Sequence, residues 1–187
     1  MIAVIDESSP EGPGGIYYVV SAAVLLDADV VGTALGALFD AQRTRPFHWT
    51  REGPEARARV VELLCTSGVV AHVTVHHPVG RRRQEQARTA ALEELVPLIA
   101  AEGATELVIE SRRPKDDERD RSTILDVARA LDLVLTYRWE AKEERLLWLA
   151  DAVCGAVKEY LLGEDAAPYE LLHASGVLSE IRYRHAP

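Results

Sequence analysis

Cysteine is scarce in this chain, which has only Cys65 and Cys154. Neither has a second cysteine or a histidine at the spacing of a zinc site or a CxxC redox motif. Both lie among apolar residues, so we expect reduced, buried thiols and neither a disulfide nor a zinc site.

Long apolar runs are also missing. No run approaches the ~20 residues that cross a membrane, and residues 1–7 lack the basic residues that open a signal peptide. We therefore expect a cytoplasmic protein without a membrane segment.

Several sequence motifs of common enzymes are absent: GxGxxG, GxxxxGK[ST], GxSxG and HExxH. The sequence therefore gives no support for a dinucleotide enzyme, a P-loop enzyme, a serine hydrolase or a zincin.

Basic residues are fewer than acidic ones: the chain has 21 Lys and Arg against 30 Asp and Glu, for a net charge of -9. This balance argues against a general nucleic-acid coat protein, but not against an enzyme that holds divalent metal with carboxylates.

The 187 residues suit one domain with a substantial core. β-branched runs predict strands at 2–7, 16–25, 69–75, 106–110 and 133–139, and apolar residues at helical spacing predict helices at 27–43, 54–66, 81–102, 122–131 and 143–162. Residues 111–121 are expected to be a solvated loop and helix start, and 169–184 a short helix with a return strand. The order predicts an α/β fold with a mixed five-stranded sheet, antiparallel strands first and helices on both faces. We expect one domain over 1–187, with a core at 2–162 and a C-terminal extension at 163–187.

Three acids lie at positions where a ligand site of an α/β sheet would form. Asp6 ends the first expected strand, Glu110 ends the fourth, and Asp151 interrupts the apolar run 146–157. Ligands of open α/β sheets bind at the carboxyl ends of strands, so parallel first and fourth strands would bring Asp6 and Glu110 together. A final helix packed across the sheet would add Asp151. Carboxylates this close repel one another unless a cation such as Mg²⁺ lies between them.

Each of these residues also has a structural interpretation. Acids are common where strands enter turns, and Glu7 points to the face opposite Asp6. Glu144, Asp151 and Lys158 are spaced in sevens and form a polar stripe that would equally suit a face toward solvent. His48 lies in a connector, where a lone histidine is more often structural than functional.

Four short motifs follow one another along the chain in an order that is similar to that of a known family. They are Ile5-Asp6-Glu7-Ser8, the strand that contains Tyr18-Val19-Val20-Ser21, Phe47-His48-Trp49, and Leu149-Ala150-Asp151. Together they resemble an uncharacterised bacterial family known as domain of unknown function 3800. Its members open on Asp-Glu-Ser-Gly, carry a late Ala-Asp motif, and are assigned an RNase H-like fold. Ser9 stands here in place of the motif glycine. The resemblance covers residues 2 to about 160.

The resemblance implies roles for particular residues. Asp6, Glu110 and Asp151 correspond to the acidic ligands that hold Mg²⁺ or Mn²⁺ in RNase H-like nucleases, with Glu7 supporting them and His48 as a recurrent motif histidine. The Glu110-Ser111-Arg112 segment, followed by Asp117 and Asp120, resembles an actinobacterial-type branch in which Glu replaces the strand-end Asp. Candidates for a fourth acid are Glu62 and Asp117.

Three functions remain open. The first is a metal-dependent nuclease or phosphodiester hydrolase acting on RNA or DNA, with Lys142 or the pair Arg112 and Arg113 on phosphate. The second is a non-catalytic RNase H-like binding or regulatory module, such as one serving a defence system or a mobile element. The third is a small-molecule hydrolase, which no motif supports.

Overall fold

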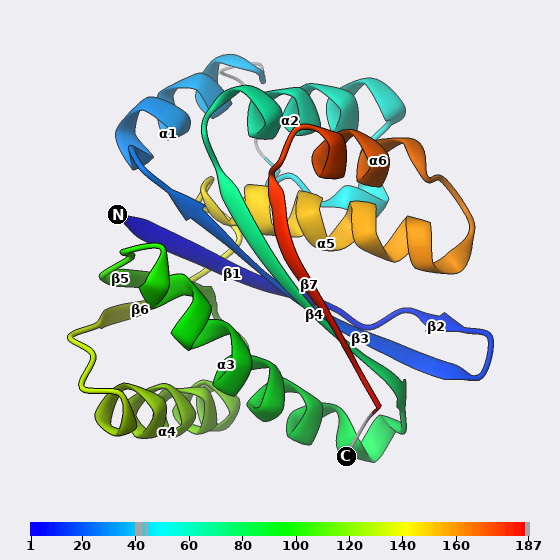
Figure 1. Cartoon of the computed structure of the whole chain (residues 1–187). Helices are drawn as coiled ribbons and strands as arrows, with labels where there is room; N and C mark the ends of the chain where they lie inside the picture. The colour runs from blue at the N-terminus through cyan, green and yellow to red at the C-terminus, as the bar shows by residue number, and fades with distance from the viewer. Residues whose placement is uncertain (40–42, 44, 186–187) are drawn as a thin grey trace.

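The computed structural model describes residues 1–39, 43 and 45–185 (Figure 1). One twisted sheet runs through the molecule, and helices cover it on both sides. The strands are β1 (Ile2–Ser8), β2 (Glu11–Gly12), β3 (Gly15–Leu25), β4 (Val70–Val79), β5 (Glu106–Glu110), β6 (Thr136–Glu140) and β7 (Leu178–Arg184). The helices are α1 (Ala28–Ala37), α2 (Pro54–Thr66), α3 (Gln84–Ala101), α4 (Pro114–Ala130), α5 (Leu147–Leu162) and α6 (Ala167–Ala174), with short 3₁₀ turns η1 (Trp49–Arg51) and η2 (Arg81–Arg83).

The sheet has the strand order β6-β5-β1-β3-β4-β7, with β2 paired to β3 beside this path. β3 is antiparallel to both β1 and β4, whereas β1, β5 and β6 are parallel. The expected α/β arrangement, with antiparallel strands followed by alternating helices and strands in a mixed sheet, is thus confirmed. The sheet contains two strands more than the five expected, the short β2 and the C-terminal β7.

Two hydrophobic cores lie on opposite faces of the sheet. On β1, Val4 packs toward α1, α2, α5 and α6, while Ala3 and Ile5 pack toward α3 and α4 (Figure 1). Side chains alternate along a strand, so Asp6 continues the Val4 side and Glu7 the Ile5 side. The two acids at the end of β1 therefore enter different environments.

Helix α5 lies almost wholly inside the molecule, because it packs on β1 and β3 with one side and on α2, α6 and η1 with the other. This explains why its sequence is apolar nearly all round. It ends at Gly163, which adopts a left-handed φ of 70° as a C-cap. It begins at Leu147, later than the expected 143, because residues 141–146 form turns.

Other boundaries also differ from expectation. The segment 111–121 is mostly helix: α4 begins at Pro114, and Asp116 and Asp120 are buried, since arginines pair with both. The predicted helix 27–43 is observed as α1, capped by Asp27, and its expected residues 40–42 lie outside the described part. β7 adds to β4 in parallel, so the expected C-terminal extension joins the sheet. Within the described residues, no helix has the length and apolar character needed to cross a bilayer.

Candidate functional site

Asp6 and Glu110 meet at the carboxyl ends of two neighbouring strands. β1 and β5 pair in parallel with Ile5 opposite Ile109, so the next residues, Asp6 and Glu110, lie side by side where this pairing ends. Helix α5 packs across β1 and adds Asp151 from the side of the sheet that Asp6 faces. Of the expected polar stripe, Glu144 precedes α5 and pairs with Arg138. Asp151 points at the strand ends and not at bulk solvent, and it is only 7% exposed.

Lys142 fills the centre of these three carboxylates. Its Nζ donates to Asp6 Oδ2 at 2.5 Å, to Glu110 Oε2 at 2.7 Å and to Asp151 Oδ1 at 3.2 Å. The lysine lies in the connector that follows β6, and Trp148 Nε1 fixes this connector by donating to the Lys142 carbonyl at 2.8 Å. The expected phosphate contact of Lys142 is therefore replaced, in this arrangement, by contacts to the acids.

Burial and the interactions among the charged groups shift the pKa values of Asp6, Glu110 and Lys142. Burial, and then the hydrogen bond with Glu110, raise the pKa of Asp6 well above its usual range. Burial acts in the same sense on Glu110, but hydrogen bonds with Asp6 and Lys142 outweigh it and lower the pKa of Glu110. The pKa of Lys142 is raised, because the charges of Asp6 and Asp151 outweigh its own burial. Asp6 accordingly holds a proton more strongly than Glu110 does.

Asp151 is fixed by the η1 turn. The backbone N–H of Trp49 donates to Asp151 Oδ2 at 2.6 Å, and His48 Nδ1 lies 3.9 Å from Asp151 Oδ1. The Trp49 ring packs directly on Gly155, where an added Cβ would lie 2.1 Å from the ring. His48, expected as a motif histidine, is therefore brought to the cluster, while Trp49 is a buried support.

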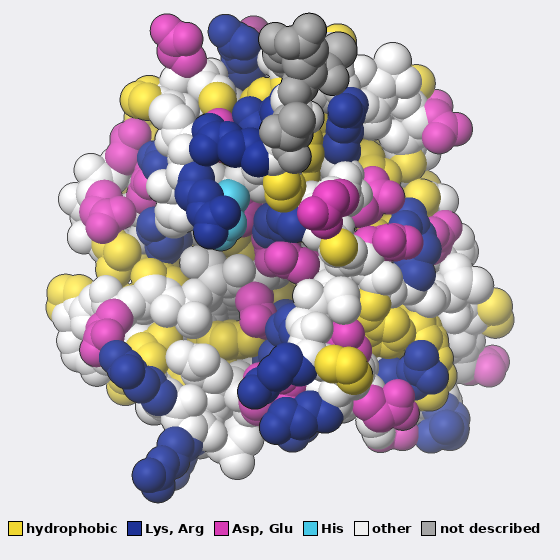
Figure 2. Space-filling model, turned by 180° about the vertical axis from the view of Figure 1, so that it is seen from behind, with side chains coloured by type: hydrophobic (Ala, Val, Ile, Leu, Met, Phe, Trp, Pro, Cys, Tyr) yellow, Lys and Arg dark blue, Asp and Glu magenta, His cyan; other side chains and the backbone are white. Residues whose placement is uncertain are grey.

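A pocket of about 250 Å³ opens over the cluster. Its lining includes the three carboxylates, Lys142, His48 and, two helical turns beyond Asp151, Lys158. The surface seen in Figure 2 carries acidic side chains near its centre, with Lys and Arg side chains gathered above and below them.

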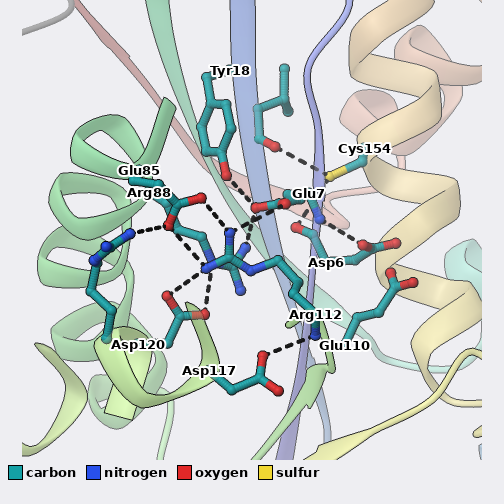
Figure 3. A network of polar contacts seen from close by, with 12 residues as sticks. Asp6, Glu7, Tyr18, Glu85, Arg88, Glu110, Arg112, Asp117, Asp120 and Cys154 are labelled. Carbon is teal, nitrogen blue, oxygen red and sulfur yellow. Dashed lines mark hydrogen bonds and ion pairs between the residues drawn. The ribbon is translucent and has the colours of Figure 1, made fainter. Parts of the chain in front are cut away.

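Glu7 belongs to a second network on the opposite face of β1 (Figure 3). Its carboxylate accepts from Arg88 and from the Tyr18 hydroxyl. Arg88, only 2% exposed, also donates to Asp120 Oδ2 at 2.8 Å. Arg112 donates to Asp120 Oδ1 at 3.0 Å and to Glu85 Oε1 at 2.9 Å.

This network accounts for three of the supporting residues expected from the sequence. Glu7, Arg112 and Asp120 hold β1, α3 and α4 together, and their charges are used within the protein. Arg88 was missed, although it lies in helical register with Leu92, Leu95 and Ile99 on the buried side of α3. A charged residue on an apolar stripe is the signal that would have identified it.

The remaining candidates lie outside the carboxylate cluster. Asp117 accepts from Ser111 Oγ and from the Arg112 N–H, both at 2.9 Å, and so closes the first turn of α4. Arg113 pairs with Asp116 at 2.6 Å. Glu62 is exposed on α2 and does not line the pocket. Neither Asp117 nor Glu62 joins the three acids as a fourth.

The donor set suits a hard divalent ion, because three carboxylates converge on one point and oxygen is the ligand that Mg²⁺ and Mn²⁺ prefer. The Lys142 ammonium is a stand-in cation at that point. Within the described residues, no group of three or more His, Cys, Asp or Glu side chains has the arrangement needed to hold a metal ion. The carboxylate donors are therefore of the chemical type that binds a divalent ion, whereas their geometry in this structure is the one that binds the Lys142 ammonium.

Comparisons with known proteins give distant structural similarities but no sequence match. No family model matches the chain, and no curated protein sequence matches it. A solved structure, "Structure of the PCNA:RNase HII complex from Archaeoglobus fulgidus", contains a chain with 17% identity and a TM-score of 0.48. The similarity covers 94% of this chain and 77% of that one.

Proposed function

We infer that this protein is a divalent-metal-dependent phosphodiester hydrolase of nuclease type, with Asp6, Glu110 and Asp151 as the residues that hold Mg²⁺ or Mn²⁺. The observation that carries this function is the convergence of three carboxylates from β1, β5 and α5 on a single cation position. Three acids from separate elements are costly to gather in a buried place. Such a cost is typical of sites shaped for chemistry.

The chain's own residues have distinct tasks in this function. A bound divalent ion would supply an activated water and would stabilise negative charge on the phosphate. The Trp49 N–H holds one oxygen of Asp151 and thereby directs the other toward the cation position. His48, whose side chain is 42% exposed at the pocket, is placed to exchange a proton with the reacting phosphodiester.

Calorimetric titration with Mn²⁺, together with cleavage of labelled RNA and DNA strands, tests this function. We expect Asp6→Asn and Asp151→Asn to abolish metal-dependent cleavage and to weaken Mn²⁺ binding. Asparagine at 151 keeps an oxygen for the Trp49 N–H, so the thermal unfolding temperature should change little. The matched control is Glu62→Gln, which neutralises an exposed acid away from the pocket. Cleavage that survives in both asparagine variants would refute the hydrolase.

A non-catalytic binding or regulatory module is the second candidate, and a specific observation favours it. Lys142 already compensates the buried carboxylates, so the cluster is stable without a metal ion. This candidate predicts that millimolar Mg²⁺ or Mn²⁺ produces no binding heat and no thermal shift. Metal binding with cleavage favours the hydrolase.

A further inference from the structure

The cations that line the pocket differ in whether their charge is already used. Arg88 pairs with Glu7 and Asp120, Arg112 pairs with Glu85 and Asp120, and Lys142 pairs with the three carboxylates. Lys158 also lines the pocket, but within the described part of the chain its ammonium makes no ion pair or hydrogen bond. It is consequently the pocket lysine with a charge to offer a ligand.

Lys158 is also held in a defined place. It extends from the rigid, buried α5, two turns after Asp151 on the same side of the helix, and its stem is half-buried. Between the two, Gly155 carries no side chain into the pocket. A lysine with a buried stem places its ammonium where water and ligands reach it.

The seven-residue spacing along α5 separates Lys158 from Asp151 and so from the phosphate that would react at the carboxylates. Seven residues of α-helix rise about 10 Å, so Lys158 extends into the pocket from a point about that far along α5 from Asp151. A cation there suits the next phosphate of a continuous strand whose reacting phosphate lies at the carboxylates. On the opposite flank, the charges of Arg88 and Arg112 are already paired with carboxylates.

We propose that Lys158 binds a phosphate adjacent to the scissile one, and that the substrate is therefore a nucleic-acid strand and not an isolated phosphodiester. This inference rests on the proposed hydrolase function and adds the substrate class and a specificity residue to it. It also assigns to Lys158 of α5 the phosphate-binding role that was expected from the sequence for Lys142 or for the pair Arg112 and Arg113.

Fluorescence anisotropy with a fluorescein-labelled oligo(dT) strand tests the role of Lys158, in an Asp6→Asn background that leaves the strand intact. Lys158→Met should weaken binding roughly tenfold, as expected for one lost charge-assisted contact. The slope of log affinity against log salt should fall by about 0.7, the value for one phosphate of a single strand. Lys158→Arg keeps the charge and should restore both.

The matched control is Lys115→Met, which removes the same charge from an exposed position outside the pocket. It should leave both quantities close to those of the background protein. Equal effects of the Lys115 and Lys158 changes, or no effect of Lys158→Met, would overturn the inference, as would a lack of strand binding by the background protein.

Cleavage of the same strand by the wild-type protein is measured separately. A strand that is cleaved but bound equally well by Lys158→Met refutes the role of Lys158 and leaves the hydrolase standing. Weakened binding without cleavage by any variant supports Lys158 as a strand contact and refutes the hydrolase.

Discussion

At the scale of single residues, Lys142 decides what the carboxylate cluster can bind. Its ammonium occupies the point that Asp6, Glu110 and Asp151 share, and a divalent ion that uses these oxygens must compete with it. The connector around Lys142 has no periodic pattern, so its position was not predictable. Asp6 and Glu110 were predictable, because each directly follows the apolar run of its strand.

Lys142→Met should make the metal-free protein less stable and metal binding stronger. Removing the ammonium that the three carboxylates share costs about 3 kcal/mol, and it leaves the carboxylates free to bind Mn²⁺. We expect Mn²⁺ affinity to rise roughly tenfold, equivalent to about 1.4 kcal/mol, and the unfolding temperature to recover when Mn²⁺ is added. Calorimetry and thermal unfolding in chelator measure both.

Lys158→Met is the control for this change, since it removes the same charge from the same pocket without touching a carboxylate. It should leave Mn²⁺ affinity nearly unchanged. A Lys142→Met variant that binds Mn²⁺ more weakly than wild type would show that the lysine assists the metal and does not compete with it.

At the scale of elements, η1 and α5 are joined by a close contact at Gly155. The Trp49 ring fills the place where a side chain would be, and the same turn supplies the N–H that holds Asp151. The sequence predicted both segments but not their contact. A glycine in an apolar helix indicates that something approaches closely, without indicating what approaches.

Gly155→Ala should disturb the pocket through this contact. A Cβ 2.1 Å from Trp49 Cγ forces η1 away from α5, and overpacking of this kind costs about 1–3 kcal/mol. We expect a lower unfolding temperature and weaker Mn²⁺ binding, because the Trp49 N–H no longer fixes Asp151. Gly80→Ala, with no atom within 4 Å of the new Cβ, should change neither. Unaltered Trp fluorescence and stability in Gly155→Ala would contradict the contact.

At the scale of the whole molecule, the network around the buried Arg88 connects the strand that carries Asp6 to the two helices behind it. Arg88 comes from α3, Glu7 from β1, and Asp120 from α4, so one guanidinium joins three elements (Figure 3). Sequence patterns identify each element separately. The pairing depends on how α3 and α4 dock on the sheet, which no local pattern encodes.

Arg88→Met should therefore destabilise the protein globally. It leaves the buried Asp120 and the partly buried Glu7 without the Arg88 guanidinium that they share, a change that costs about 3–5 kcal/mol. Arg119→Met, which removes a half-exposed arginine paired with Glu85, should cost only about 0–1 kcal/mol. Urea denaturation measures both, and equal small losses would show that the network contributes little to stability.

The sequence alone determined the α/β class, the order of the main strands and helices, and the acids most worth testing. Helix α2 was predicted at its observed bounds, since Pro54 opens it and the apolar spacing ends at Thr66. These features depend on neighbouring residues. Segment 111–121 was expected to be a solvated loop and helix start, whereas most of it is helix α4, and Asp120 is buried against Arg88 of the distant helix α3.

Only the tertiary structure decided which charges are free. The pairing of β1 with β5 and the docking of α5 bring residues 6, 110, 142 and 151 to one point. The same packing neutralises Arg88 and Arg112 and leaves Lys158 open to the pocket. Electrostatic partners are chosen by proximity in space, and spacing along the chain does not encode that proximity.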